Sequence, residues 1–148
     1  MATGRILGLD FGERRIGVAI SDPDARFALP LHSIDTRAGD AIGQIEALTR
    51  AEDVTAVVVG LPLSLSGDHT AQTETTIAFA RDLEARLKLP VHLHDERLST
   101  QEAMHLVSDQ PGRGRKAKAR DADTDALAAS IILQAYLDAQ RFAAEPAP

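Results

Sequence analysis

The stretch that decides the fold is residues 5–21, which read RILGLDFGERRIGVAIS. Two runs rich in apolar and β-branched residues, Arg5–Phe11 and Arg15–Ser21, flank a short turn that contains Gly12. Runs of this composition joined by so short a connection are typical of an antiparallel hairpin. A third extended run at 27–34 contains Pro30, which places it at an edge of the sheet or on a bulge.

After these strands the hydrophobic pattern alternates between helical and extended segments. The run VTAVVV at 54–59 is continuous and β-branched, as in a central parallel strand that is covered on both faces. Apolar residues at helical spacing predict the helices around it, and Ser99 followed by Glu102 forms a capping box that predicts another. The expected later elements are a helix at 41–51, the strand at 54–59, a helix from about 70 to 87, a strand at 91–94, a helix at 99–107 and a last helix from about 124 to 142.

Together these elements predict an α/β fold: a mixed five-stranded sheet, with three antiparallel strands followed by parallel ones, and helices on both faces. The 148 residues suit one domain, expected over residues 1–142, with a disordered tail at 143–148. The chain has no cysteine, which excludes disulfides, thiolate metal sites and thiol nucleophiles. It shows neither a signal-peptide pattern nor an apolar run long enough to span a bilayer, so we expect a cytoplasmic protein with no membrane partner.

Three acidic residues occupy positions where soluble folds rarely place a charge. Asp10 lies inside an apolar strand, Glu96 follows the last strand, and Asp125 lies in the expected first turn of the last helix. A carboxylate in a central strand is costly to desolvate unless a cation or hydrogen-bond donors compensate it. If the three converge, they form an oxygen-rich site suited to Mg²⁺ or Mn²⁺, which can support phosphodiester cleavage. Asp10 also fits a turn, and Asp125 is favoured by the helix dipole alone. Glu96 also fits a surface ion pair with Arg97 or Arg14.

Four segments together resemble the motifs of the YqgF/RuvX family, the Holliday-junction resolvases or pre-ribosomal RNA nucleases. They occur in order: GLDFGERRIGVA at 8–19, GLPL at 60–63 followed by Gly67, DERLST at 95–100, and TDALAA at 124–129 running into IILQ at 131–134. Four motifs in order over nearly the whole chain make the resemblance specific. The chain departs from many members at Ser64-Leu65-Ser66, where they carry a more polar stretch similar to Asn-Met-Asp.

The resemblance implies a ribonuclease H-like fold in which Asp10, Glu96 and Asp125 are the metal-binding catalytic acids. It also implies a metal-dependent nuclease that acts on structured nucleic acid and matures the 5′ end of the small-subunit ribosomal RNA precursor, pre-16S rRNA. Endonuclease activity of the resolvase type on branched DNA is the alternative, since it was inferred for the family from a similarity to RuvC. Asp10 is then expected to bind both metal ions, while Glu96 and Asp125 complete their coordination.

The distribution of basic residues is compatible with a nucleic-acid partner although the net charge is −6. Five of the 16 basic residues lie at 113–120, where a loop is expected to hold the phosphate backbone without reading its sequence. Arg14 and Arg97 are expected near the scissile phosphate, and both fit structural salt bridges equally well. His92 and His94 share one side of their strand and are expected to pack rather than to bind metal. The expected backbone contacts of the loop come from Arg113, Arg115, Lys116 and Lys118.

Two other classes of protein fit parts of the sequence. A hairpin like the one after Gly8 also occurs in ATP-binding domains of the actin and sugar-kinase type, but these need two such domains and 148 residues supply one. A non-catalytic module associated with the ribosome or with transcription would bind without cleaving, and the three acids weigh against it. The number of subunits stays open, since a monomer suffices for trimming RNA ends whereas symmetric incision of a four-way junction needs a homodimer.

Overall fold

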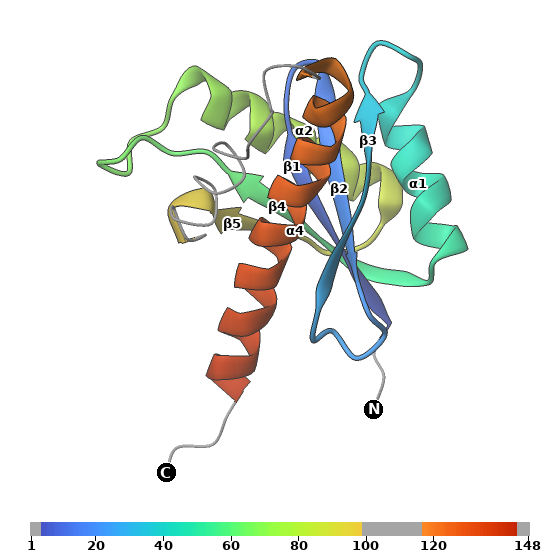
Figure 1. Ribbon diagram of the computed structural model, residues 1–148. Helices are drawn as coiled ribbons and strands as arrows, with labels where there is room; N and C mark the ends of the chain where they lie inside the picture. The colour runs from blue at the N-terminus through green and yellow to red at the C-terminus, as the bar shows by residue number, and fades with distance from the viewer. Residues whose placement is uncertain (1–3, 99–116, 145–148) are drawn as a thin grey trace.

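The computed structural model describes residues 4–98 and 117–144, with side chains except at 117–123 and 144. Figure 1 shows one twisted sheet with helices packed against it. The strands are β1 (Arg5–Phe11), β2 (Arg15–Ser21), β3 (Ala28–Asp35), β4 (Val54–Leu61) and β5 (Val91–Asp95); the helices are α1 (Ala41–Ala51), α2 (Ala71–Leu87) and α4 (Ala117–Ala144), with a 3₁₀ turn, η1, at Glu96–Leu98.

The sheet has the strand order β3-β2-β1-β4-β5. β1 pairs antiparallel with β2, and β2 with β3, whereas the β1–β4 and β4–β5 pairs are parallel. The predicted mixed sheet is therefore confirmed. β3 is an edge strand, and its register against β2 shifts beside Pro30, as expected for a proline in a strand. Because β1, β4 and β5 run in parallel, they end at the same edge of the sheet, which is where sites form in α/β folds.

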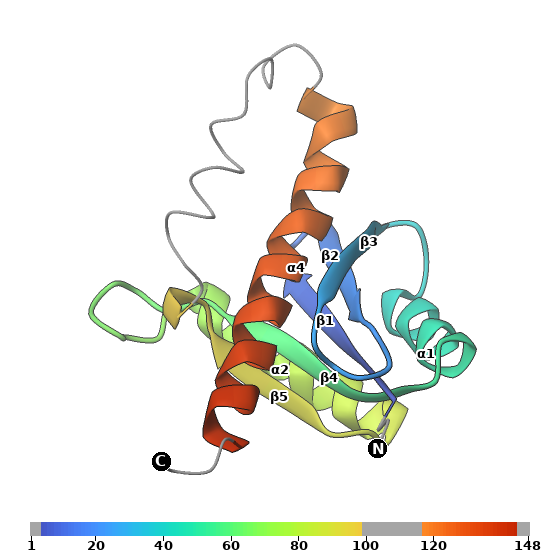
Figure 2. The ribbon, with the colours of Figure 1, turned by 60° about the horizontal axis from the view of Figure 1, so that its bottom comes forward.

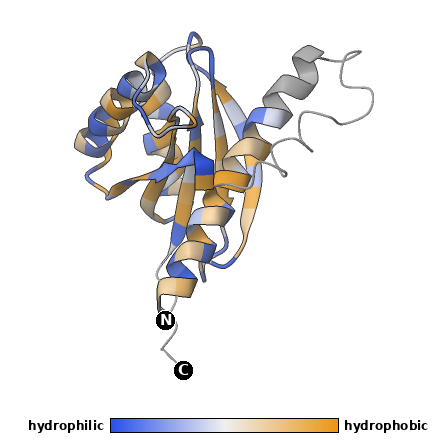
Figure 3. Ribbon diagram, turned by 90° about the vertical axis from the view of Figure 1, so that its left-hand side faces the viewer, coloured by the Kyte–Doolittle hydropathy of each residue, from blue (hydrophilic) through white to orange (hydrophobic). Residues whose placement is uncertain are grey.

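The helices pack on opposite faces of this sheet. Figure 2 shows α4 lying across one face, while α1 and α2 contact the other. The side chains of β4 alternate between the two: Val57 and Val59 enter the core under α1 and α2, and Val58 packs with Ala129 and Leu133 of α4. The continuous β-branched run of β4 is thus covered on both faces, as predicted. Figure 3 shows hydrophobic residues concentrated in the strands and in the middle turns of α4.

α4 approaches the sheet very closely at Gly17 of β2. A Cβ atom at this position would lie 2.0 Å from the backbone oxygen of Asp125. Only a glycine leaves room for a helix backbone at that distance. Gly17 therefore holds Asp125 directly over β2, next to the strand that carries Asp10.

The last helix begins earlier than the sequence predicted. The prediction took Thr124 as its start, but α4 runs from Ala117, so Asp125 lies well inside it. Residues 117–123 contain alanines, a lysine and an arginine, which favour the helix, and no glycine or proline that would stop it. The helix-dipole interpretation of Asp125 is therefore wrong, and Lys118 lies in α4 rather than in a loop. At its other end α4 continues to Ala144, two residues into the predicted tail.

The other predicted elements agree with the structure apart from small shifts at their ends. β3 begins and ends one residue later than predicted, while β4 and β5 extend further, to Leu61 and Asp95. The helix predicted at 99–107 lies outside the described residues, as do Arg113, Arg115 and Lys116. Within the described part of the chain, no helix is long and apolar enough to cross a membrane.

Candidate active site

The structure brings Asp10, Glu96 and Asp125 together at the carboxyl edge of the parallel strands. Asp10 is near the end of β1, Glu96 opens η1 directly after β5, and Asp125 reaches the same place from α4. Each acid therefore comes from a different element, and their convergence could not be read from spacing. The structural interpretation of Glu96 as a partner of Arg97 or Arg14 is wrong, because its side chain instead shares a hydrogen bond with Asp10.

Gly60 makes the contact between Glu96 and Asp10 possible. β4 lies between β1 and β5, so a side chain on β4 would separate the two acids. A Cβ atom on Gly60 would lie 2.9 Å from Oε1 of Glu96 and 2.7 Å from Cδ1 of Ile132. The glycine thus leaves the space through which Glu96 reaches across β4, a role of Gly60 that was not predicted from the sequence.

The electrostatics of the three carboxyl groups reflect their crowding. Burial, together with the negative charges of Glu96 and Asp125, raises the pKa of Asp10 to about 7. Burial also raises the pKa of Glu96, and the nearby charge of Asp95 adds to this. The pair therefore retains a proton near neutral pH, because two adjacent buried carboxylates cannot both ionise without a compensating cation.

Arg15 supplies one positive charge to this cluster. Its Nε donates to Oδ2 of Asp125 at 2.5 Å, and both side chains are only partly exposed. The sequence predicted a role for Arg14 but not for Arg15. The missed signal is the period of two in β2: Ile16 and Val18 face α1 and α2, so Arg15 and Gly17 face α4 and its Asp125.

The carboxylates of Asp10, Glu96 and Asp125 suit a hard divalent cation, although in this structure each already has a hydrogen-bond or ion-pair partner. Carboxylate oxygens are the ligands that Mg²⁺ and Mn²⁺ prefer, and the raised pKa of Asp10 marks a place where a cation would be stabilised. Among residues 4–98 and 124–143, no three acidic or histidine side chains have the arrangement of a formed metal site. In this structure Asp10 shares a hydrogen bond with Glu96, and Asp125 forms an ion pair with Arg15.

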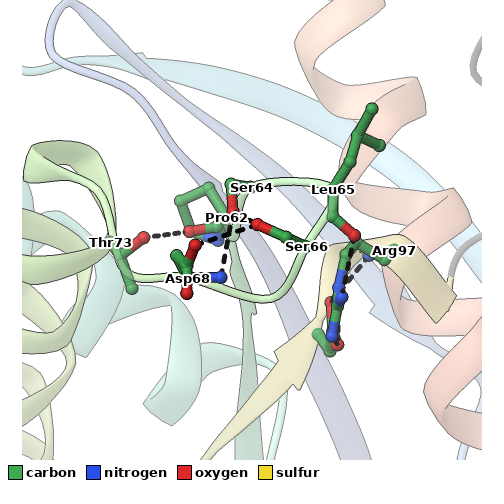
Figure 4. A network of polar contacts seen from close by, with 8 residues as sticks. Pro62, Ser64, Leu65, Ser66, Asp68, Thr73 and Arg97 are labelled. Carbon is green, nitrogen blue, oxygen red and sulfur yellow. Dashed lines mark hydrogen bonds and ion pairs between the residues drawn. The ribbon is translucent and has the colours of Figure 1, made fainter.

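Arg97 holds the loop between β4 and α2 rather than a member of the acid cluster. Its guanidinium pairs with Asp95 at 2.7 Å and donates to the backbone oxygen of Leu65 at 3.3 Å. The loop has its own polar network, in which Ser66 donates to Asp68 and Thr73 of α2 donates to the oxygen of Pro62. Figure 4 shows these contacts, with the side chain of Leu65 pointing away from them. Arg97 therefore adopts the structural salt bridge that the sequence allowed.

His92 and His94 face α4 and pack against Tyr136. The His92 ring stacks on Tyr136 with centroids 5.7 Å apart, and His94 meets the same ring edge-on at 6.0 Å. Burial lowers the pKa of His94, so the neutral ring is favoured. Nε2 of His94 has no hydrogen-bond partner within the part of the chain that the structure describes. Both histidines thus pack, as expected.

Arg14 is exposed on the turn between β1 and β2, at the mouth of a cavity that Asp125 also lines. Of the basic residues expected to hold the phosphate backbone, Lys118 lies within α4 but its side chain is outside the described part. The remaining three, at 113–116, are outside it altogether.

The chain is similar to known proteins over nearly its whole length. The model of the RuvX family, described as Holliday junction resolvase, matches residues 4–139. A relative from Chloroflexus aurantiacus, named as a candidate pre-16S rRNA nuclease, is 47% identical over 137 residues, which is 92% of this chain and 88% of the relative. A relative of the same name from Syntrophus aciditrophicus is 45% identical over 136 residues, covering 91% of this chain and 89% of that protein.

The fold is also found among solved structures. RuvC of T. thermophilus, in complex with a Holliday junction substrate, superposes with a TM-score of 0.61 over 97% of this chain and 99% of RuvC. At 16% identity this match speaks for the fold alone, and it confirms the expected ribonuclease H-like architecture. With a family model that covers almost all of the chain and relatives well above 40% identity, this protein belongs to the RuvX family of nucleases.

Proposed function

We propose that this protein is a divalent-metal-dependent nuclease that acts in the cytoplasm on structured RNA, trimming the 5′ end of pre-16S rRNA. The observation that carries the proposal is the convergence of Asp10, Glu96 and Asp125 across the gap at Gly60. A binding protein gains nothing from crowding three carboxyl groups at such electrostatic cost. The names of the relatives from Chloroflexus and Syntrophus support RNA as the substrate.

In this proposal Asp10, Glu96 and Asp125 hold Mg²⁺ or Mn²⁺. Bound there, the ion supplies activation of the attacking water and neutralises charge at the phosphate. Asp10 must give up its proton for the ion to bind, and Asp125 must exchange Arg15 for it. Arg15, once released, is close enough to Asp125 to turn its guanidinium toward a phosphate oxygen.

The neighbouring arginines have separate tasks. Arg14 is exposed beside the cluster and is available for the substrate backbone. Arg97 positions Glu96 and does not contact the substrate: by pairing with Asp95, it fixes the course of the backbone directly after β5, where Glu96 lies. The basic segment at 113–118 contributes further phosphate contacts in this proposal.

Cleavage of branched DNA is the second candidate. The family description and the RuvC-like fold favour it. Symmetric incision would require two copies of the chain, whereas trimming of an RNA end needs one.

The test is a cleavage assay on an end-labelled precursor RNA fragment and on a four-way DNA junction, each with Mg²⁺, Mn²⁺ or EDTA. We expect metal-dependent cutting of the RNA that Asp10→Asn and Glu96→Gln abolish. Asp82→Asn is the matched control, because Asp82 is an exposed carboxylate on α2 outside the cluster. Cutting of the junction alone would select the resolvase function. No cutting of either substrate by a folded protein that binds Mn²⁺ would favour a non-catalytic binding module.

A further inference from the structure

A cavity of about 610 Å³ opens directly beside Asp125. One wall is the turn from β1 into β2, with Arg14 and Arg15, and the opposite wall is the first turns of α2, with Gln72 and Thr75. Its volume is in the range of sites that hold a small organic ligand, about 300–1,000 Å³. Because Asp125 lines it, the cavity adjoins the acid cluster.

A second, smaller cavity shares Arg14 and Arg15 with the first. It measures about 200 Å³ and is lined by Arg14, Arg15, Asp35 and Arg37. Within residues 4–98 and 124–143, the side chains of Arg14 and Arg37 form no ion pair, so both are available to an anion. In a chain with a net charge of −6, arginines gathered next to an acidic cluster are suited to a phosphate.

Gln72 and Thr75 offer complementary hydrogen-bonding groups on the wall formed by α2. They are three residues apart on the helix and therefore neighbours on its surface. The hydroxyl of Thr75 already donates to the backbone oxygen of Ala71 at 3.0 Å, so toward the cavity Thr75 is left only as an acceptor. The side-chain amide of Gln72 has no partner among the described residues and donates freely.

The wall is also held in place. Thr70 and Thr73 cap the start of α2 reciprocally, and Thr73 donates to the oxygen of Pro62 at the end of β4. Thr76 donates to the backbone oxygen of Gln72 at 2.8 Å. Polar groups fixed in this way can discriminate between ligands, because they do not rearrange when a partner is missing.

We infer that the larger cavity seats the nucleotide that adjoins the scissile phosphate and that Gln72 and Thr75 recognise its ribose 2′-hydroxyl, while Arg14 and Arg37 hold the phosphate beyond it. A 2′-hydroxyl donates to Thr75 and accepts from Gln72 at once, and a deoxyribose does neither. The inference rests on the proposed function and adds the feature by which this site selects RNA over DNA.

The test uses a stem–loop RNA that contains the cleavage site, and versions of it with a single 2′-deoxy substitution at each position near the cut. For the wild type we expect one position at which the missing hydroxyl lowers kcat/KM by about tenfold, as loss of one or two hydrogen bonds would. Gln72→Ala and Thr75→Val should lower kcat/KM on the all-ribose RNA to a similar extent. On the RNA deoxy-substituted at that position they should cause no further loss, because the contact is already absent.

Two further variants separate sugar recognition from general binding. Arg37→Ala should weaken the ribose and deoxyribose substrates equally, since a phosphate contact does not distinguish them. Gln44→Ala, an exposed glutamine on α1, should change nothing. Independent losses from the Gln72 or Thr75 variants and from the deoxy substitution would overturn the inference while leaving the proposed nuclease intact.

The same RNAs are also titrated by fluorescence anisotropy in EDTA, which needs no cleavage. A deoxy-sensitive affinity that Thr75→Val removes would support the cavity even if no RNA were cut and the proposed function had failed. Equal affinities of wild type and Thr75→Val for every RNA would overturn it.

Discussion

Asp10 is the residue whose chemistry depends most on its surroundings. Its pKa is raised to about 7 by burial and by the charges of Glu96 and Asp125. In an unfolded chain an aspartate titrates near 3.9. Between these values the folded protein binds a proton that the unfolded chain does not, so without metal the free energy of unfolding falls as the pH rises from about 4 to 7.

This linkage predicts that the proposed catalytic acid destabilises the metal-free protein at alkaline pH. In EDTA at pH 8, we expect Asp10→Asn to raise the free energy of unfolding by about 2 kcal/mol, whereas at pH 5 the two proteins should unfold alike. Urea titrations at both pH values measure this, with Asp82→Asn as the exposed control. A loss of stability at pH 8 would show that the crowded charges are not the cause of the raised pKa.

The ion pair between Arg15 and Asp125 should weaken the binding of a metal ion at the acid cluster. Because its guanidinium holds Asp125 at 2.5 Å, it competes with any cation for that carboxylate. In the absence of nucleic acid we expect Arg15→Gln to tighten Mn²⁺ binding by about tenfold, equivalent to about 1.4 kcal/mol. Isothermal titration calorimetry measures the affinity directly. Arg15→Lys, which keeps the charge, should resemble the wild type, and weaker Mn²⁺ binding by Arg15→Gln would refute the competition.

At the residue scale the sequence singled out the three acids but not the residues beside them. Asp10, Glu96 and Asp125 stood out by their positions, Asp10 most of all because a charge inside an apolar strand is rare, and the family resemblance pointed to the same three. The role of Gly60 depends on β4 lying between β1 and β5, and the role of Arg15 depends on where α4 crosses β2. Neither arrangement can be read from the sequence before the order of strands in the sheet is known.

Two glycines determine how closely the elements that carry the acids can approach one another: Gly17 lies against α4, and Gly60 lies against Glu96. A Cβ on Gly17 would meet the backbone of α4 at 2.0 Å, whereas a Cβ on Gly60 would meet side-chain atoms of Glu96 and Ile132, at 2.9 and 2.7 Å. A side chain can change its rotamer to make room for an added methyl group, but a helix backbone cannot. A substitution at Gly60 should therefore affect mainly activity, and one at Gly17 mainly stability.

We predict that Gly60→Ala costs about 1 kcal/mol of stability yet removes most of the nuclease activity, because Glu96 is pushed away from Asp10. Gly17→Ala should cost about 3 kcal/mol or more, since α4 must shift as a whole. Thermal unfolding and the RNA cleavage assay measure both effects. Full activity of Gly60→Ala would mean that the gap over β4 is not what brings the two acids together.

The elements themselves were predictable where one periodic pattern dominated. The hairpin of β1 and β2 and the buried strand β4 follow from local sequence. The start of α4 did not, because Thr124 and Asp125 look like a cap and a first turn, while the real helix continues backward through residues that favour it equally. Asp125 is placed by the approach of α4 to Gly17, which is a tertiary contact.

On the scale of the whole molecule, the sheet separates two cores with different relations to the site. Leu83 of α2 is fully buried in the core under α1 and α2, and Leu133 of α4 is fully buried on the other face. Of the helices in these two cores, α4 is the one that carries a proposed metal ligand. Packing on that face should therefore affect both stability and the site.

Truncating Leu83 and Leu133 to alanine, one at a time, tests whether only the core under α4 affects the site. Both variants should lose about 3 kcal/mol of stability, because the buried volume removed is the same. Leu133→Ala should also weaken Mn²⁺ binding by about tenfold, which is the lower end of the loss in metal affinity seen when residues that orient the metal ligands are mutated. Leu83→Ala should leave Mn²⁺ binding unchanged. Both affinities are measured by calorimetry well below the unfolding temperature, so that only folded protein is titrated. Equal affinities in the two variants would mean that Asp125 is held by its approach to Gly17 and by Arg15, independently of the core beneath α4.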